Sequence, residues 1–574
     1  MSLNSIRDRL GKACFVCLLS FCFSLFMFWQ PAPSIAAGAD IYQNTEINRI
    51  LDENYQQVQE NGYAKLSLPP ALHGLKDSDF SPNSLKAART LIAAGHEAYI
   101  IGGAVRDIIM GKEANDFDVV TSATNEEIAA LLPKVTFHAI QTGQEYGIAH
   151  YENEDVDVAT FSNIPYTFYG KKGIPDFDPK AIYGKDALSD SFQRDLTINA
   201  IYYDVATGNL IDYHGGIRDI REKQISTMAA ANLTYEYKPS NALRALRFKS
   251  RYGFTLRQDV DSAIKGHIGE YIANMQGRAF ANEIKKMSYT GYTRECFKNL
   301  LSYGVIENGF PPVTELCRQK SYQDYMVTVT SMLDEAYQNK KKDPVYKNCL
   351  PAAILYPAVL SRMEAGASFE NSMKEVLDQE YKFYRFKDEE RQSIEGIWRL
   401  EQELIHERDN SRLEMLRQNK YYPAASILWV GNASAKLNAL KHTDIFLPTA
   451  LRHIFLGDYK HGIVGGCHYA NLNNPCMEVV KDTKTIMGKQ GAYLARVKLN
   501  GIMKQAYNGY STFFPDSYSP QQAIDAINEA YQNRVKVPGT RNLYLGMSKD
   551  GLEIEMYVTE DGKIVSAFPR EIKS

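Results

Sequence analysis

The chain has 574 residues, of which 44% are hydrophobic and 23% are charged. This composition excludes an intrinsically disordered chain and provides enough apolar material for about three or four domains. The formal net charge is only −3, so a polyanionic partner must be bound by a local basic patch and not by the overall charge.

The first 39 residues have the pattern of a signal peptide. Basic residues up to Lys12 precede an apolar run from Ala13 to Trp29, and Ala37–Ala39 has the small-x-small form of a cleavage site. The run is shorter than the about 20 residues that a membrane span needs, so no stable span is expected after leader cleavage. An exported, secreted protein is therefore predicted, and a membrane-anchored or cytoplasmic one is the alternative.

The rest of the chain changes its hydrophobic pattern twice. Helical patterns first alternate with short β-rich runs such as EAYIIGG and DFDVVTS, which predicts an α/β (α+β) domain. A long region with apolar residues three and four apart follows, which predicts an all-α body. Alternating runs and one helix opened by Ser519 and Pro520 then predict a C-terminal α+β domain. The expected boundaries are 1–39 for the leader, 40–83 for an entry segment, 84–235 for the head, 236–330 for a helical neck, 331–444 for a helical body or linker, and 445–574 for the last domain.

Five cysteines follow the leader, and this odd number implies no complete disulfide framework. Cys467 and Cys476 could pair across a short loop in an oxidising compartment, but spacing alone leaves this open. The sequence holds no Cys/His pattern typical of a metal site.

The stretch IIGGAVRDIIMGKEANDFDVV combines a glycine pair with two aspartates one residue apart. Asp116 and Asp118 are at positions i and i+2 of a predicted strand and so face the same way, which suits Mg²⁺ bound together with substrate phosphates. Gly102 and Gly103 let backbone N–H groups approach a triphosphate, and Arg106 can add positive charge. Each half alone would indicate only a turn or a solvated strand end.

Together these features resemble the first motif of the class II CCA-adding enzyme and bacterial poly(A) polymerase family, and further motifs follow in order across residues 84–330. By this resemblance Asp157 in DVDVATF is a further metal-binding carboxylate, and RDLTINAIYYD places Arg194, Asp195 and Asn199 near the nucleotide. LIDYHGGIRDI resembles the family's flexible third motif. The resemblance implies a nucleotidyltransferase head of the polymerase-β type, with Mg²⁺ as cofactor, ATP and CTP as substrates, and RNA, above all tRNA, as partner.

The base-reading part departs from the family pattern. NALRALRFKSRYGF resembles the helix that presents an EDxxR triad to the incoming base, but Tyr237, Lys238 and Asn241 occupy the three triad positions. Gln193 and Ser162 also replace expected arginines. The sequence therefore offers no evident source for a choice between CTP and ATP.

Three arginines, Arg244, Arg247 and Arg251, fall on one face of that helix. This spacing fits contact with phosphate, and by the resemblance Arg244 and Arg247 bind nucleotide; a solvated helix face is the alternative. The helical region that follows resembles the family's RNA-binding neck and body.

Two histidines, His453 and His468, stand fifteen residues apart near the other end of the chain. Two imidazoles can act as base and acid in one turnover. Residues of about 450–570 resemble the bacterial EndoU endoribonucleases, in particular at STFFPDSYSPQQAIDAINEAY and LEIEMYVTEDGKIVSAFP. The resemblance implies that these histidines are the acid/base pair and that Lys504 stabilises charge on phosphate, with Lys498 as the competing lysine.

EndoU enzymes cleave RNA, typically beside uridine, through attack of the ribose 2′-OH, which leaves a 2′,3′-cyclic phosphate and requires no metal. By resemblance Ser566 takes the place of a Thr or Ser that contacts phosphate or uracil. Phe568 stands where many relatives have tyrosine, and this change keeps base stacking but loses a hydroxyl contact. A small RNA-binding domain with structural histidines is the alternative.

The two resemblances predict a bifunctional RNA-acting protein. Because the extracellular space lacks ATP and CTP, a leader on such a protein indicates delivery into another cell, as for an exported toxin whose producer is guarded by an immunity protein. One alternative is a housekeeping tRNA nucleotidyltransferase and RNA-processing enzyme. The other is a non-catalytic RNA-binding adaptor that carries an EndoU nuclease.

Overall fold

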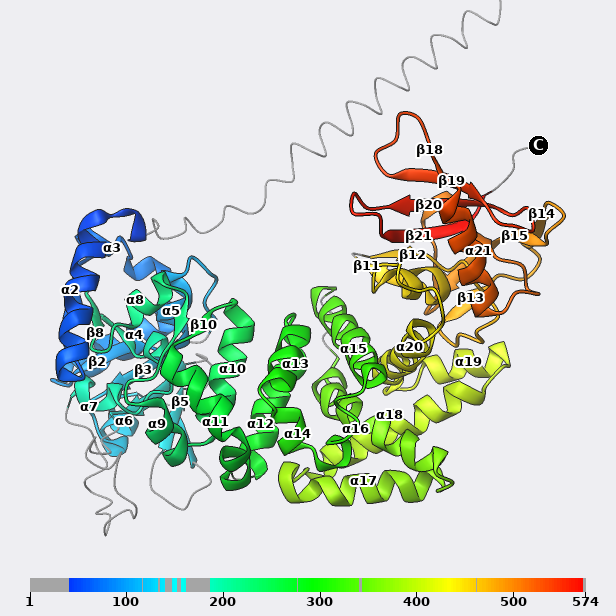
Figure 1. Ribbon diagram of the computed structural model, residues 1–574. Coiled ribbons are helices and arrows are strands. Elements are labelled where there is room, and N and C mark those ends of the chain that lie inside the picture. Colours follow the sequence, from blue (N-terminus) through cyan, green and yellow to red (C-terminus); the bar gives the residue numbers. More distant parts are fainter. Residues whose placement is uncertain are drawn as a thin grey trace, which may run out of the picture. The chain divides into compact units, whose positions relative to one another are not determined.

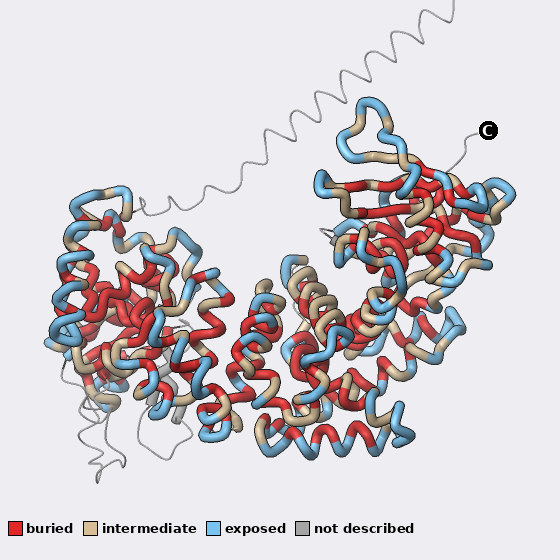
Figure 2. The backbone as a smooth tube through the Cα atoms, viewed as in Figure 1, coloured by how far each residue is buried: buried red, intermediate tan, exposed pale blue. Residues whose placement is uncertain are grey.

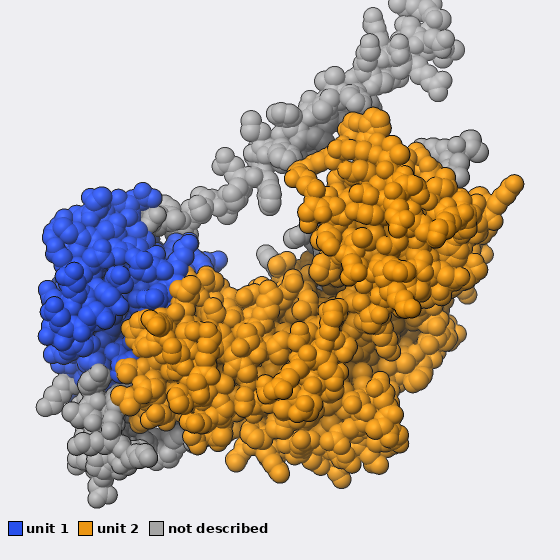
Figure 3. Space-filling model, in the orientation of Figure 1, with its two compact units in different colours: residues 1–229 blue, residues 230–574 orange. Residues whose placement is uncertain are grey.

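The computed structural model describes residues 41–115, 117–132, 135–139, 147–151, 156–161, 186–275, 277–339, 343–460 and 462–570. The chain forms two compact units, Met1–Ala229 and Ala230–Ser574 (Figure 3). The predicted leader, Asp116 and Ser162 lie outside the described residues.

The first unit is built on an eight-stranded sheet with the strand order β1-β8-β7-β2-β3-β6-β5-β4 (Figure 1). Strands β3 and β6 run parallel, and every other neighbouring pair is antiparallel. The strands are β1 (Leu66–Leu68), β2 (Ala98–Ile101), β3 (Asp118–Thr121), β4 (Val135–Ala139), β5 (Gly147–Tyr151), β6 (Val156–Thr160), β7 (Ile201–Asp204) and β8 (Leu210–Asp212). Because β1 pairs with β8, the entry segment expected at 40–83 contributes a strand to the head.

Short helices connect these strands. Helix α4 begins where the Ser81 side chain accepts the N–H of Asn83 and Pro82 takes the first helical position. The helical elements of this unit are η1 (Ile41–Gln43), α2 (Thr45–Asn61), α3 (Pro70–His73), η2 (Asp77–Asp79), α4 (Pro82–Ala93), α5 (Gly103–Ile109), α6 (Asn125–Leu131), α7 (Ala187–Ser191), η5 (Thr197–Asn199) and α8 (Gly216–Arg221), and a short strand β9 (Gln224–Ile225) follows.

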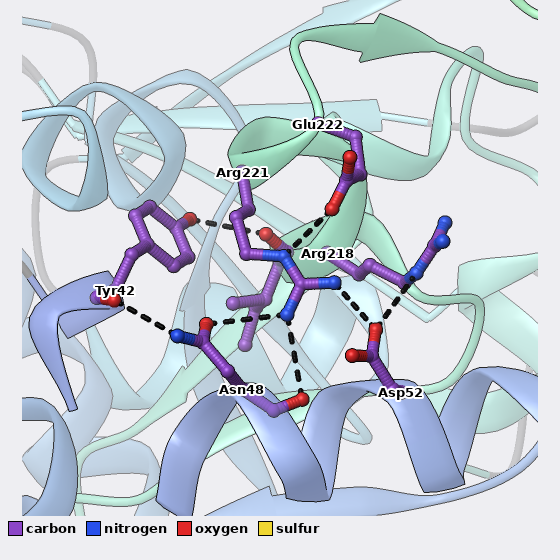
Figure 4. Close-up of polar contacts among 7 residues, drawn as sticks. Tyr42, Asn48, Asp52, Arg218, Arg221 and Glu222 are labelled. Carbon is purple, nitrogen blue, oxygen red and sulfur yellow. Dashed lines mark hydrogen bonds and ion pairs between the residues drawn. The ribbon is translucent and has the colours of Figure 1, made fainter. Parts of the chain in front are cut away.

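A polar network fixes helix α2 against helix α8 (Figure 4). Arg221 is ion-paired with Asp52, and the Nε atom of Arg218 lies 3.3 Å from the same carboxylate. The hydroxyl of Tyr42 donates to the carbonyl of Ile217 at 3.0 Å. The segment ahead of the glycine motif is therefore anchored to α8, the helix that contains the second half of the third motif.

The second unit starts with a helical region in which apolar faces pack against one another, for example α15 against α20. Its elements are α9 (Ala231–Tyr237), α10 (Ser240–Tyr252), β10 (Thr255–Leu256), α11 (Gln258–Asn274), α12 (Gly277–Ser288), α13 (Thr293–Ser302), α14 (Val305–Gly309), η6 (Pro311–Val313), α15 (Lys320–Gln338), α16 (Tyr346–Glu364), α17 (Phe369–Tyr384), α18 (Asp388–His406), α19 (Asn410–Arg417) and α20 (Tyr422–Asn438).

The C-terminal region is an antiparallel α+β arrangement. Strand β15 pairs with β13, β14, β16 and β17, and β18-β19-β20-β21 form a second sheet. Helix α21 opens at a capping box in which Ser519 and Gln522 bond reciprocally. The elements are η7, a π-helix (Arg452–Leu456), β11 (Asp458–Lys460), β12 (Ile463–Gly465), β13 (Met477–Val479), β14 (Thr485–Met487), β15 (Ala492–Leu499), β16 (Ile502–Met503), η8 (Ala506–Gly509), β17 (Tyr510–Phe513), α21 (Pro520–Gln532), β18 (Val535–Lys536), β19 (Leu543–Met547), β20 (Glu553–Val558) and β21 (Ile564–Pro569).

Buried residues follow the sheets and the inward faces of the helices (Figure 2). Among the described residues, no helix combines the length and the apolar character needed to cross a membrane. The predicted fold class, a mixed head with a helical body and an α+β C-terminal domain, is confirmed.

Candidate active sites

In the head, the glycine turn lies directly beside the first acidic strand. Gly102 has φ +80° and ψ −133°, a conformation that side chains rarely adopt. An added Cβ at Gly102 would lie 3.7 Å from the Oδ2 atom of Asp118, and one at Gly103 would lie 3.4 Å from Nη2 of Arg106. The backbone therefore approaches the carboxylate with no side chain between them.

Asp118 and Asp157 belong to β3 and β6, the one parallel pair of neighbouring strands described in this sheet. Val119 pairs with Val158, so Asp118 and Asp157 are the next pair and face the same side of the sheet. Such a pair fits Mg²⁺, which takes one or two carboxylates and completes its shell with substrate phosphates. Asp116, the third predicted ligand, is not among the described residues, and those that are contain no group of three His, Cys, Asp or Glu that could hold a metal.

Three predicted nucleotide-binding residues of the head lie in one buried network. Arg106 is only 3% exposed, and its Nε atom donates to Asp107 at 2.9 Å. Its guanidinium also donates to the side-chain oxygen of Asn199, and the amide of Asn199 donates to Asp195 at 2.9 Å. Arg106, expected to add charge to a triphosphate, thus ties the glycine turn to the second motif from inside the protein.

Arg194 lies beside a buried carboxylate that the sequence did not single out. Its Nη2 atom is 2.7 Å from Asp190, and the hydroxyl of Tyr202 donates to the same carboxylate at 2.8 Å. Burial lowers the pKa of Arg194, but Asp190, through its charge and its hydrogen bond, together with Tyr202 and, to a smaller extent, Asp118, outweighs burial, so the net shift of this pKa is upward. Arg194 is therefore a permanent positive charge near Asp118.

The third motif is a buried, tightly held turn. Asp212 is fully buried and accepts backbone N–H bonds of 2.8–3.0 Å from three residues of the turn that follows it. An added Cβ at Gly216 would come within 2.1 Å of the carbonyl oxygen of Thr197. The glycine therefore permits close contact between the second and third motifs.

The arginines of helix α10 do not share one exposed face. Arg251 is exposed and Arg244 is partly buried, but Arg247 is 8% exposed and its Nε atom donates to Glu283 of α12 at 3.0 Å. The guanidinium of Arg247, which was expected to contact phosphate, is therefore already paired with a carboxylate of the protein. At the triad positions, Asn241 is buried whereas Tyr237 is 43% exposed.

The C-terminal region contains a pocket of about 1060 Å³ that brings together distant parts of the sequence. His453, His468, Lys504, Ser566 and Phe568 all line it. The ring centroids of the two histidines are 6.4 Å apart. Apart from the competing lysine Lys498, the residues predicted from the EndoU resemblance thus line one cavity.

His453 lies on the π-helix η7 and is oriented by a carboxylate. Its Nδ1 atom is 3.0 Å from Oδ2 of Asp458. A carboxylate only accepts, so Nδ1 carries the proton and Nε2 is the nitrogen available to a substrate. Added Cβ atoms at Gly465 and Gly466 would lie 2.6 Å from Asp458 and 1.8 Å from the carbonyl of His453, so the glycine pair allows this close packing.

The Nδ1 atom of His468 also faces an oxygen acceptor, here a backbone carbonyl. This Nδ1 atom lies 2.8 Å from the carbonyl oxygen of Thr512 and must donate to it, which leaves a lone pair on Nε2. The imidazole stacks on Phe568 with centroids 4.5 Å apart and an interplanar angle of 16°. Burial, with smaller contributions from Lys504 and His453, lowers the pKa of His468 well below its usual value. His468 is therefore neutral and able to accept a proton.

The structure distinguishes the two candidate lysines. Lys504 is 6% exposed, and its Nζ atom donates to the carbonyl of Gly466 at 3.1 Å and to Oγ of Ser511 at 2.5 Å. Burial lowers the pKa of Lys504. Lys498 instead pairs with Glu478 at 3.3 Å and is not among the described residues that line the pocket.

Ser566 and Phe568, the two pocket residues expected to contact the RNA base or phosphate, have different surroundings. The Oγ atom of Ser566 is buried and has no hydrogen-bond partner among the described residues. One face of the Phe568 ring is covered by His468, so the stacking predicted for a base is used on that side by the catalytic candidate. Sequence reasoning missed Asp458, although a carboxylate five residues after a histidine was a usable signal.

Cys467 and Cys476, whose pairing the sequence left open, are both free and buried. Burial raises the pKa of Cys467 to about 12 and that of Cys476 to about 11. Both thiols are therefore unreactive in this environment.

Comparison with known proteins identifies both regions. The poly A polymerase head domain family matches residues 98–226, and the bacterial EndoU nuclease family matches residues 449–571. These matches confirm both resemblances predicted from the sequence.

The individual relatives fall into two groups, nucleotidyltransferases and a toxin. Poly(A) polymerase I of Escherichia coli is 25% identical over 383 residues, covering 63% of this chain and 80% of that protein. The CCA-adding enzyme of Bacillus licheniformis is 34% identical over 232 residues, which are 38% of this chain and 56% of the relative. A Bacillus cereus protein named toxin is 43% identical over 136 residues, 24% of this chain and 25% of the toxin. The crystal structure of the Bacillus stearothermophilus CCA-adding enzyme in complex with CTP is 19% identical, covers 63% of this chain and 80% of that chain, and has a TM-score of 0.42.

Proposed function

We propose that this chain, which joins a poly A polymerase head domain to a bacterial EndoU nuclease domain, is a bifunctional RNA-acting protein. Its head transfers nucleotides to RNA, and its C-terminal domain cleaves RNA beside uridine. The observation that carries the nuclease is the pocket itself, where two imidazoles lie beside a buried lysine with ring centroids 6.4 Å apart, the Nδ1 of one held by a carboxylate and that of the other by a backbone carbonyl.

In the proposed cleavage, His468 is the base and His453 the acid. The Nε2 atom of His468 takes the proton of a ribose 2′-OH, and the 2′-oxygen forms a bond to the adjacent phosphorus. The bond from phosphorus to the 5′-oxygen breaks, and Nε2 of His453 gives its proton to that oxygen. The products are a 2′,3′-cyclic phosphate and a 5′-hydroxyl, and exchange with water restores both imidazoles. No metal is required in this sequence of proton transfers.

Lys504 and Asp458 support this reaction without exchanging protons with the substrate. The Nζ atom of Lys504 keeps one N–H beyond its two bonds to Gly466 and Ser511 and can stabilise charge developing on phosphate. The Asp458 carboxylate accepts the Nδ1–H of His453 and stabilises the positively charged imidazolium, in which Nε2 also carries a proton for the leaving group.

The nuclease is tested with full-length protein and an end-labelled RNA that contains a single uridine, in the presence of a chelator. Cleavage with a 2′,3′-cyclic phosphate end is expected, and His468→Ala should abolish it. An RNA with 2′-deoxyuridine at that position should stay intact. Cleavage of the deoxy substrate would contradict the mechanism.

For the head, we propose metal-dependent transfer of a nucleoside monophosphate from ATP or CTP to the 3′ end of an RNA, with tRNA as the leading substrate. Asp118 and Asp157, with Asp116, would hold Mg²⁺, which supplies charge neutralisation on the phosphates when bound. Arg194 adds fixed positive charge close to Asp118. The names of the relatives, poly(A) polymerase I and CCA-adding enzyme, support this reaction class.

The altered triad gives a specific alternative, in which the head binds RNA without transferring nucleotides. Tyr237, Lys238 and Asn241 replace the base-reading side chains, and Asn241 is buried. Labelled ATP and CTP are offered with tRNA to the wild type and to Asp118→Ala. Incorporation that the substitution abolishes supports the transferase. Absence of incorporation in both proteins, with tRNA still bound, identifies the adaptor.

We also propose export as a toxin, with an immunity protein in the producing cell. The signal-peptide pattern of residues 1–39 and the 43% identity to part of the Bacillus cereus toxin support this. A mature N-terminus at Asp40 in the culture medium is expected. An intact Met1 in the cytoplasm would instead support the housekeeping function.

A further inference from the structure

One wall of the nuclease pocket is a ladder of side chains from strands β20 and β21. Glu555 pairs with Phe568, and Tyr557 pairs with Ser566. Because alternate residues of a strand share a face, these four side chains lie together on the pocket side, and all four line the pocket. His468 stacks on Phe568, so the wall continues directly from the proposed catalytic base.

An exposed aromatic side chain stands at the rim of the same pocket. Tyr507 in η8 is 77% exposed and lines the pocket. Its backbone has φ 52° and ψ 40°, and Asn508 after it has φ 53° and ψ 33°. Two consecutive non-glycine residues in the left-handed region are unfavourable. The loop therefore has an unfavourable backbone at the residue whose ring is exposed to solvent. In this position the ring can stack on an RNA base.

Glu555 is an unusual residue for a pocket that takes RNA. The only hydrogen bond to its carboxylate that the described residues show is a long one, 3.5 Å, from the hydroxyl of Tyr557. Glu553, two residues earlier on the same face, is instead ion-paired with Arg570 at 3.2 Å. A carboxylate repels phosphate, so Glu555 weakens RNA binding unless it accepts hydrogen bonds from a base.

A second polar group on this wall also lacks a protein partner. Ser566 is 6% exposed, and its buried Oγ atom makes no hydrogen bond within the described part of the chain. Buried hydroxyls without partners are costly, so a ligand with polar edges is the expected partner on this wall. Ser566 pairs with Tyr557, the residue two positions after Glu555 on the same face of β20, so Ser566 and Glu555 lie on neighbouring rungs of this wall. Tyr507 lines the same pocket.

We propose that Tyr507 and Glu555 form a guanine-reading subsite for a nucleotide next to the cleaved linkage. This inference rests on the proposed nuclease. Tyr507 stacks on the base, and the two oxygens of the Glu555 carboxylate accept the parallel N1–H and N2–H donors of guanine. Adenine, cytosine and uracil each present a donor beside an acceptor on that edge, so they form one such bond at most and place a lone pair against the second oxygen.

The test uses full-length protein and short RNAs with one cleavable uridine, in which a 2′-deoxy nucleotide carrying guanine, adenine, cytosine or uracil occupies each flanking position in turn, so that only one linkage can be cleaved. The wild type should cleave the RNA with guanine at one flanking position about tenfold faster, as kcat/KM, than its counterparts, as expected of a bidentate contact. Glu555→Gln should remove this preference. Glu553→Gln, the matched control, should keep it, and Tyr507→Ala should slow all substrates by a similar factor because stacking tolerates every base.

Binding measurements distinguish a failure of the guanine subsite from a failure of the proposed nuclease. The same RNAs, with 2′-deoxyuridine at the cleavage position, are titrated by fluorescence anisotropy. A guanine preference in binding without any cleavage of the ribose substrates would refute the nuclease and keep the subsite. Equal affinity for all bases, or a Glu555→Gln variant that retains the guanine preference, would overturn the subsite.

Discussion

Replacing Glu401 with Gln should remove a pH-dependent loss of stability from the helical body. Glu401 of α18 is fully buried. Tyr356 donates its hydroxyl to this carboxylate, and the amide of Asn432 donates at 3.1 Å. Burial raises the pKa of Glu401 to about 7, although Tyr356 and Asn432 act in the opposite direction. The group is therefore protonated in the folded state under conditions in which the unfolded chain has released the proton.

The magnitude follows from the two pKa values. The usual value is 4.5 and the folded value is about 7, and each unit corresponds to about 1.4 kcal/mol. Between these pH values the unfolded chain binds fewer protons than the folded one, so the free energy of unfolding falls as the pH rises through the window. The wild type should lose about 3 kcal/mol between about pH 4.5 and 7 relative to Glu401→Gln.

Tryptophan fluorescence reports on the unfolding of the helical body. Of the three tryptophans, Trp398 and Trp429 belong to α18 and α20, and Trp29 lies in the predicted leader. Urea unfolding followed by this signal at several pH values gives the stability difference between the wild type and Glu401→Gln. Glu403→Gln, on an exposed position of the same helix, should show the wild-type pH dependence. A pH-independent difference between the wild type and Glu401→Gln would refute the reasoning.

Three further predictions concern the active site and the neck. Asp458→Asn should slow RNA cleavage by about 10²–10⁴-fold with little change in RNA affinity, because His453 loses the carboxylate charge that orients its ring and stabilises its protonated form; unchanged single-turnover rates would contradict this role. The acidic limb of kcat/KM against pH should lie below pH 6.5, since the pKa of His468 is lowered by burial; a limb above 6.5 would assign the base elsewhere. Glu283→Gln should destabilise the protein by about 3–5 kcal/mol by leaving the buried Arg247 without its charge partner. The control Lys286→Ala, which removes a more exposed contact to the same carboxylate, should cost less than about 1 kcal/mol in the same unfolding experiment.

The parts of the fold that were predicted from the sequence are those that short-range rules control. Ser519 and Pro520 mark the start of α21, where the Ser519 side chain accepts the N–H of Gln522. Local periodicity also indicated the helical body. These features depend on neighbouring residues, which a sequence displays directly.

The unpredicted parts depend on contacts between distant residues. Arg247 was assigned to a helix face by its spacing, but its partner Glu283 comes from another helix and turns it into a buried ion pair. Phe568 was expected to stack on a base, whereas its pairing with His468 arises only when β21 packs beside the loop that carries His468. Asp458 acts on His453 because a π-helix and a glycine pair bring them together.

The central claim is that two imidazoles of one pocket cleave RNA through its own 2′-hydroxyl. The most direct measurement is the chemical form of the new RNA ends made by full-length protein with a chelator present, determined by mass spectrometry. A 2′,3′-cyclic phosphate paired with a 5′-hydroxyl, absent from both His453→Ala and His468→Ala, is the predicted result. A 5′-phosphate end, or wild-type cleavage by either variant, would contradict the account.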